Sequence, residues 1–239
     1  MVSLEVRRTA GQLAQRYGED ALGRPDGLAE VLGVKVRSSP IQHGLLAHLS
    51  GPGPDGWWTA SVSDAAGRLD SWWDELSDAA PQWRWRIRLL HELGHALVRS
   101  GRAAAFAGDL EEMFCDRFAE HCLALSMSSG PCDPSDFFTA CDRNAVPPPV
   151  AATRAMADGA ADAVVVFRTR EGRPETLLRA GLVRANQWHA IRAGVHREGF
   201  TVSFVADALY TAIVGGTAES RNDAGRDSAS SVGPCAAVG

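Results

Sequence analysis

The feature that most constrains this chain is the pentapeptide HELGH, from His91 to His95, inside a stretch (residues 84–100) whose apolar spacing predicts a helix. Four residues make slightly more than one helical turn, so His91 and His95 project from the same face. Two imidazoles so arranged can bind one divalent ion, at about 2 Å from each ring nitrogen. Glu92 lies about 100° around the helix, which disfavours it as a ligand but puts it beside any water that the ion holds. We therefore predict a metal site in which Glu92 is the general base.

A third ligand has to come from another segment. The metzincin pattern would need Gly at position 98 and His at 101, whereas the chain has Val98 and Gly101, so that class is excluded. A second helix is predicted to begin near Asp109, and in it Glu112 and Asp116 are four residues apart and share a face. Glu112 would complete a His-His-Glu set that leaves the fourth position open to water. Asp116 would accept the spare N–H of a ligand histidine and fix its tautomer.

Other interpretations of this second helix stay open. Asp109 and Glu112 also fit a capping box, in which Glu112 would serve only the start of the helix. Glu111 is the neighbouring alternative ligand, but it points about 100° away and has no carboxylate one turn later. His121 lies nine positions after Glu112, about 180° around the helix, and is predicted to face away from the site.

Composition limits the class of protein. The chain has 239 residues, of which 45% are hydrophobic and 22% charged, as in ordinary globular proteins. A net charge of −5 disfavours direct nucleic-acid binding. The five cysteines form no paired framework, and we expect Cys115 and Cys122 to be buried as small apolar residues rather than to act as ligands. With no leader sequence and no apolar run of membrane-spanning length, we expect a cytoplasmic protein without a membrane partner.

The pattern of periodic segments predicts an α+β fold, in which a small sheet packs on the helices of the predicted metal site and a C-terminal α/β appendage follows. Its predicted parts are a metallopeptidase domain (1–128), a linker rich in Ser, Gly and Pro (129–150), a small C-terminal region (151–214) and a disordered tail (215–239). Expected elements are helices over 3–18, 26–32 and 151–160, strands over 34–37, 43–49 and 56–63, a hairpin of 162–169 with 175–180, and helices over 184–197 and 201–214. The last helix pair could be a helix-turn-helix, but its second helix has no basic residue, which favours packing or partner binding.

Six of the seven tryptophans fall between residues 57 and 85. The simpler interpretation is that they seal the sheet against the metal-bearing helix. Alternatively, some of them line a substrate cleft, with residues 57–63 as an edge strand to which a peptide adds through main-chain hydrogen bonds. We expect His43 and His48 to be sheet residues rather than ligands.

The two motifs together carry a resemblance. HELGHAL from His91, followed by EMFCDRFA from Glu112, resembles the ImmA/IrrE family of gluzincin metallopeptidases, which show H-E-L-G-H-x-L and then E-x-x-A-N-x-F-A-x-x-L-L. Cys115 and Asp116 stand where the family has Ala-Asn, and the nearest counterpart of the family's Met-Pro is the stretch 124–128. The resemblance covers roughly residues 5–128 and implies a zincin-like metallopeptidase core there. It implies intracellular regulatory proteolysis, often of a helix-turn-helix transcriptional repressor, in bacterial stress response or mobile-element control.

The expected function is that of a zinc-dependent endopeptidase, with Zn²⁺ bound by His91, His95 and Glu112. Glu92 would take a proton from the attacking water and pass it to the leaving amine. Two alternatives remain, namely a metal-containing sensor or antirepressor that binds a regulator without cleaving it, and a degenerate fold with no ion. Whether zinc or manganese is used stays open, and so does the residue that stabilises the oxyanion, for which the unassigned candidates are His121, His189, His196 and Tyr210.

Overall fold

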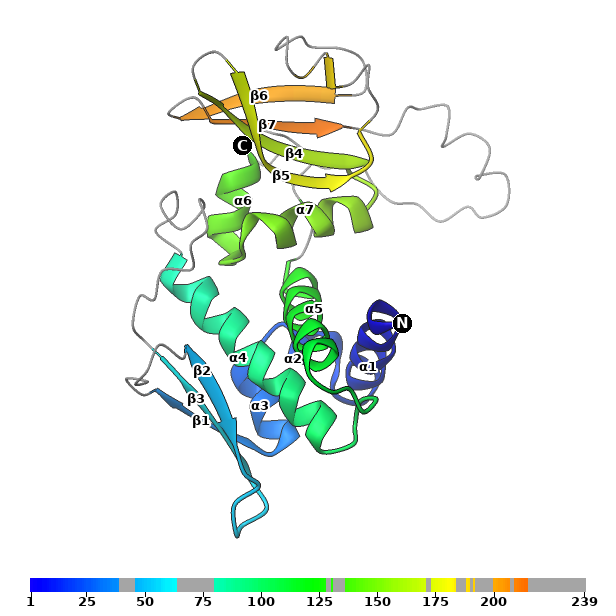
Figure 1. The fold of residues 1–239 in the computed structure, drawn as a ribbon, viewed down its shortest axis with the longest axis vertical. Helices are drawn as coiled ribbons and strands as arrows, with labels where there is room; N and C mark the ends of the chain where they lie inside the picture. The colour runs from blue at the N-terminus through cyan, green and yellow to red at the C-terminus, as the bar shows by residue number, and fades with distance from the viewer. Residues whose placement is uncertain are drawn as a thin grey trace, which may run out of the picture.

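The computed structural model describes residues 1–38, 46–63, 80–127, 130, 136–170, 173–183, 188–189, 191, 200–206 and 209–214. This part of the chain is α+β, with helices α1 to α7 and two small sheets. Figure 1 shows a four-stranded sheet at one end of the molecule, and α1, α4, α5 and a three-stranded sheet at the other end. Of the helices described, none is both long enough and apolar enough to cross a membrane. The tail predicted over 215–239 lies outside the described residues.

The N-terminal helices form as the sequence predicts. Helix α1 (Val2–Tyr17) turns an apolar face inward and packs on the second motif helix. The short α2 (Glu19–Leu22) leads to α3 (Pro25–Leu32), which begins with proline in its first turn and ends at Gly33. Gly33 has φ 74°, the left-handed conformation that terminates helices at glycine. These helices cover the core beside the helix that carries the HELGH motif.

The first sheet has the strand order β1-β3-β2. Strand β1 (Val34–Ser38) runs parallel to β3 (Trp58–Val62), and β2 (Ala47–Ser50) runs antiparallel to β3. The interpretation of residues 57–63 as an edge strand is therefore wrong, because both sides of β3 are already paired. Among the described strands, the edges of this sheet are β1 and β2, and a peptide could add to it at either of them.

The described tryptophans favour the simpler of their two interpretations. Trp83 is fully buried, and Trp58 and Trp85 are partly buried against the same core. Trp57 is more exposed and has the Lys35 ammonium 5.8 Å from its ring centroid. Their main role in the described part is therefore packing between the first sheet and the helices, while Trp72 and Trp73 lie outside the described residues.

The two motif helices cross at very short range. Helix α4 (Ala80–Arg99) carries the HELGH motif and packs against β2 and β3, while α5 (Asp109–Leu125) packs against α4. The contact centres on Gly94, since a Cβ atom built there would lie 2.9 Å from Cα of Cys115. Only a residue without a side chain permits this approach.

The arginines around the first motif do not simply pair with the acidic helix that follows. Arg86 donates from one terminal nitrogen to the carbonyl oxygens of Asn144 (2.7 Å) and Ala145 (2.9 Å). Its other terminal nitrogen donates to the carbonyl of Gly23 at 3.1 Å and to Oγ of Ser126 at 2.9 Å. Arg86 thus ties α4 to three other segments. Arg99 does pair with the second motif helix, because its Nε lies 3.4 Å from a Glu111 oxygen.

Part of the predicted linker is folded into the core. Helix α6 (Phe137–Asn144) buries Phe137 and Cys141, and α7 (Pro148–Ala157) begins before residue 151. A linker was expected because the prolines and serines nearby suggested loop, but the apolar side chains of the short α6 are enough to bury it.

The C-terminal sheet has the order β5-β4-β7-β6 and is antiparallel throughout. The predicted hairpin is confirmed as β4 (Ala163–Arg170) and β5 (Arg173–Gly181). The helix predicted over 201–214 is wrong, because these residues form the strands β6 (Phe200–Ala206) and β7 (Leu209–Val214). Their many Thr, Val, Phe and Ile residues favour strands over helices. The helix-turn-helix interpretation requires that helix and is therefore wrong as well.

The second sheet shares the main core of the molecule. Val164 and Val166 belong to the same cluster of buried residues as α4, α5 and α7, whereas Val165 and Phe167 face a second, smaller cluster. Both faces of β4 are therefore covered. The helix predicted over 184–197 falls mostly outside the described residues.

The close crossing of α4 and α5 predicts opposite effects for one chemical change at two glycines. Gly94→Ala should lower the free energy of unfolding by about 1–3 kcal/mol, because the added methyl group overpacks the contact with Cys115. Gly11→Ala should raise it by about 0.5–1 kcal/mol, because Gly11 is an exposed α1 residue with no atom within 4 Å of a built Cβ. Urea unfolding of both variants measures the difference, and equal effects would contradict the crossing.

Glu5 joins α1 to the loop before α5. Its carboxylate accepts hydrogen bonds from the backbone N–H of Ala104 (2.7 Å) and from Nε of Arg8 (2.8 Å). A second Arg8 nitrogen and the Thr9 hydroxyl also contact it. The hydrogen bond from Arg8 and, after it, that from Ala104 lower the pKa of Glu5 from 4.5 to about 2, although partial burial opposes the shift.

The lowered pKa makes the contribution of Glu5 depend on pH. A carboxyl group whose pKa is lower in the folded state stabilises the fold fully above its unfolded pKa of 4.5, and this is lost as the pH falls toward about 2. Glu5→Gln should therefore destabilise the protein at neutral pH, with a difference from wild type that shrinks below about pH 4.5. Denaturant unfolding across this range tests it. Glu120→Gln, which removes only a surface pair with Arg117, is the control. A difference that does not change with pH would contradict the assignment.

Candidate metal centre

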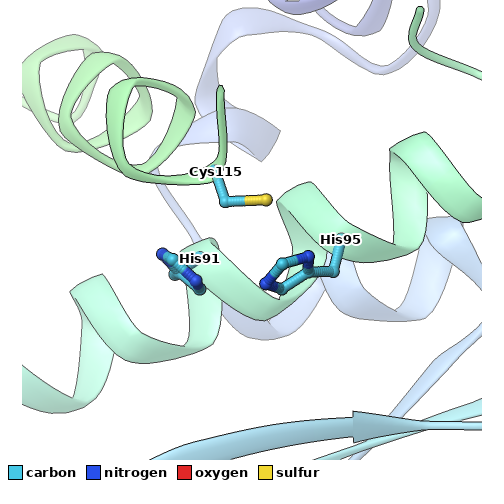
Figure 2. A group of neighbouring side chains, drawn as sticks. All are labelled: His91, His95 and Cys115. Atoms are coloured by element: carbon cyan, nitrogen blue, oxygen red, sulfur yellow. The ribbon is translucent and has the colours of Figure 1, made fainter. Parts of the chain in front are cut away.

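Helix α4 presents the two imidazoles of the motif side by side, with ring centroids 4.9 Å apart (Figure 2). Each ring has a carboxylate from α5 at its Nδ1 atom. Asp116 Oδ1 lies 2.9 Å from Nδ1 of His91, and Glu111 Oε1 lies 2.6 Å from Nδ1 of His95. A carboxylate accepts a proton at this position, so each contact favours the tautomer with hydrogen on Nδ1 and a lone pair on Nε2.

The two Nε2 atoms meet at a third carboxylate of α5. Glu112 Oε2 lies 3.2 Å from Nε2 of His91, and Glu112 Oε1 lies 3.5 Å from Nε2 of His95. Donor atoms at tetrahedral positions around an ion, each about 2.0–2.1 Å from it, are separated by about 3.3–3.4 Å. The contacts of Glu112 with His91 and His95, at 3.2 and 3.5 Å, are close to this separation, and each is made by a different carboxylate oxygen.

The donor set fits a cation for a chemical reason as well. With both Nδ1 protons directed to carboxylates, His91 and His95 offer lone pairs toward Glu112, which also has only lone pairs to offer when ionised. Acceptors that converge in this way repel each other unless a proton or a cation lies between them. Imidazole nitrogen and carboxylate oxygen are the ligands of many zinc sites with an open position.

Cys115 supplies a further donor to the same cluster. One nitrogen of each histidine and the Cys115 sulfur lie within 4.8 Å of one another (Figure 2), a group that could hold a metal ion. Glu112, the predicted third ligand, contacts the same two imidazoles at 3.2 and 3.5 Å through its two carboxylate oxygens. Burial, with nearby carboxylates, raises the pKa of the Cys115 thiol far above its ordinary value. Without a cation, Cys115 is therefore a neutral thiol and not a nucleophile.

Glu92 lies next to this cluster and is buried, at 6% exposure. Burial raises the pKa of its carboxyl group, and the charges of His95, His91 and His48 partly oppose that rise. A pKa raised in this way makes a carboxylate a better proton acceptor. His48 of β2 therefore lies within electrostatic range of Glu92. His48 is a sheet residue, as the sequence predicts. Its proximity to the site was not predicted.

Burial lowers the pKa of His91, but the hydrogen bond to Asp116 and the carboxylates of Glu92 and Glu112 outweigh it, so that the pKa is raised. The pKa of Asp116 is lowered chiefly by the same hydrogen bond. The negative charge around His91 thus favours a positive charge on its imidazole. A metal cation at the centre would supply that charge without a proton.

The remaining candidates can now be placed. The capping-box interpretation is wrong, since Gly108 caps α5 and no side chain caps the helix start. His121 is half-buried, and its pKa is lowered by burial and then by Arg7 of α1, which agrees with its predicted orientation away from the site. His189 is exposed, and no contact joins it to the centre. His43 and His196 lie outside the described residues, as does the side chain of Tyr210.

Glu111 is the residue whose role was missed. Helical spacing indicates only an alternative ligand at this position, whereas the Glu111 carboxylate contacts Nδ1 of His95 and also Nε of Arg99. Helical spacing alone could not predict this contact. Glu111 leaves α5 about 100° away from Glu112, but its side chain is long enough to reach His95. The available signal in the sequence was that Glu111 directly precedes the predicted ligand Glu112.

Comparison with known proteins adds no assignment. No family model matches the chain, and no curated protein matches it. The resemblance to the ImmA/IrrE family therefore rests on the residues of the two motifs.

The contact between Glu111 and His95 predicts a graded effect on metal affinity. Glu111→Ala should weaken binding of Zn²⁺ about 10–100-fold, because His95 loses the partner that fixes its tautomer and orientation. Glu111→Gln should recover part of the loss, since its amide oxygen still accepts the Nδ1 proton. Competition with a chromophoric chelator measures the affinities. Glu120→Ala on the same helix is the control, and an unchanged affinity in Glu111→Ala would refute the role.

Proposed function

We propose that this protein is a zinc-dependent endopeptidase whose metal ligands are His91, His95 and Glu112. The single observation that carries the proposal is the convergence of the two Nε2 atoms on the Glu112 carboxylate, at 3.2 and 3.5 Å. Three protein donors and one free position are the arrangement of catalytic zinc sites. When bound, zinc would act as a Lewis acid that activates water and polarises a carbonyl group.

The residues around the ion have separate tasks in this proposal. Glu92 accepts a proton from the attacking water and later donates it to the leaving amine, a role that its buried position and raised pKa support. Asp116 and Glu111 hold the two imidazoles through their Nδ1 atoms and keep the Nε2 lone pairs available. His48 lies near enough to Glu92 to influence it, and it is a candidate for stabilising the oxyanion.

The substrate class comes from the resemblance. Members of the ImmA/IrrE family act on regulatory proteins, so we propose a helix-turn-helix transcriptional repressor as the substrate and the cytoplasm as the place of action. The first sheet supports a peptide substrate in one respect, because the short edge strand β2 packs beside α4 and leaves one side unpaired in the described part of the chain.

Replacement of the general base tests the proposal. Glu92→Gln retains all three ligands, so its zinc content should equal that of wild type while cleavage falls by about 10²–10⁴-fold. The assay incubates each protein with the repressor encoded nearest to its gene and follows intact masses, with zinc measured by elemental analysis. Glu120→Gln, on the exposed side of α5, should behave as wild type.

Three results would count against an endopeptidase. Undiminished cleavage by Glu92→Gln would show that Glu92 is not the general base. Loss of zinc from that variant would show that Glu92 helps to bind the ion. A stable complex with an uncleaved repressor, formed by wild type with zinc bound, would instead support the metal-containing sensor or antirepressor.

A further inference from the structure

Cys115 occupies an unusual place for a cysteine with only a packing role. It lies on α5 between the proposed ligand Glu112 and its neighbour Asp116, fully buried at 0% exposure. Its sulfur lies 3.0 Å from the position of a Cβ atom built on Gly94, and Gly94 is between the two histidines of α4. The thiol is therefore packed directly against the part of α4 that carries both imidazoles.

The same sulfur is within reach of the metal centre. Figure 2 shows the Cys115 side chain extending from α5 toward α4, where one nitrogen of each imidazole lies within 4.8 Å of it. Nitrogen and sulfur donors that share a tetrahedral ion, at about 2.0–2.1 Å and about 2.3 Å from it, are separated by about 3.6 Å. A movement of the sulfur toward the imidazoles by about 1 Å would bring it into the bonding shell.

We propose that Cys115 is a further ligand of this centre, whose thiolate binds a thiophilic divalent ion together with His91 and His95. This inference rests on the metal site of the proposed function. With Glu112 also bound, the ion would have four protein donors, as in the closed sites that zinc uses for structure rather than catalysis. Thiophilic ions such as Cd²⁺ would then occupy the centre in a form with no position for a substrate.

The binding step is simple in its chemistry. The S–H bond of Cys115 breaks, its proton passes to solvent, and a bond forms between sulfur and the ion, with no change in oxidation state. Thiolate ligands select softer ions than carboxylates do, so the ion itself would decide between the two donor sets. The Glu112 side chain is 58% exposed to solvent, whereas Cys115 is buried in the core.

Cobalt is the probe that distinguishes the two donor sets. Co²⁺ replaces zinc in tetrahedral sites and shows visible d–d absorption with any such ligands, but a near-ultraviolet charge-transfer band only with a thiolate. Full-length apoprotein, reduced without added thiol, is titrated with CoCl₂. Wild type should show both features. Cys115→Ala should lose the charge-transfer band and keep the d–d bands, and Cys122→Ala, a buried thiol two turns further along α5, should keep both.

The other possible outcomes also decide whether Cys115 binds the ion. Visible bands without charge transfer in wild type, or charge transfer that survives in Cys115→Ala, would overturn the role of Cys115 and leave the proposed function intact. Absence of Co²⁺ binding by wild type would overturn both. Cys115→Ser repeats the comparison if circular dichroism shows that the alanine variant does not fold, and the wild-type spectrum alone reports whether sulfur is bound.

Discussion

The close approach of two helices at Gly94 is the constraint on which the site depends. A side chain there would meet the backbone of Cys115, so the separation of α4 and α5 is set by the absence of one carbon atom. At this separation the short acidic side chains of α5 can reach the imidazoles of α4. A wider crossing would leave His91 and His95 on their helix face without their carboxylates, and the motif would be only a pair of surface histidines.

The carboxylates of α5 divide their contacts between the two nitrogens of each ring. Glu111 and Asp116 take the Nδ1 atoms, one for each histidine, and Glu112 is shared between the Nε2 atoms. Because three acidic groups surround two imidazoles, the cluster has an excess of negative charge that a divalent cation would balance. Arg99 supplies one positive charge, but at Glu111, on the outer side of His95. The inner position, beside the two Nε2 atoms, could hold a metal ion.

The sequence predicted the parts of this site that follow from helical geometry. The pairing of His91 with His95, and of Glu112 with Asp116, depends only on residues four apart in a helix, and the contact of Asp116 with His91 is present. The angle and distance between helices cannot be read from such spacing, so the reach of Glu111 and the nearness of Cys115 emerged only with the fold. The helix predicted over residues 201–214 is wrong for a different reason. Their apolar positions suit either a helix or a strand, and pairing with β4, remote in sequence, decided between them.

Exposure differs sharply between the two sides of the centre, and this difference favours a macromolecular substrate. Glu92 and His95 are almost entirely buried, at 6% each, whereas Glu112 and Asp116, on the α5 side, have side chains that are 58% and 67% exposed. The proposed base Glu92 thus lies in a low-dielectric environment that strengthens its interactions, while the proposed ligand Glu112 faces solvent. A small-molecule enzyme would more commonly enclose its site on all sides. A centre open along one helix can instead receive an extended peptide, whose own atoms would then exclude water from Glu92 during the reaction.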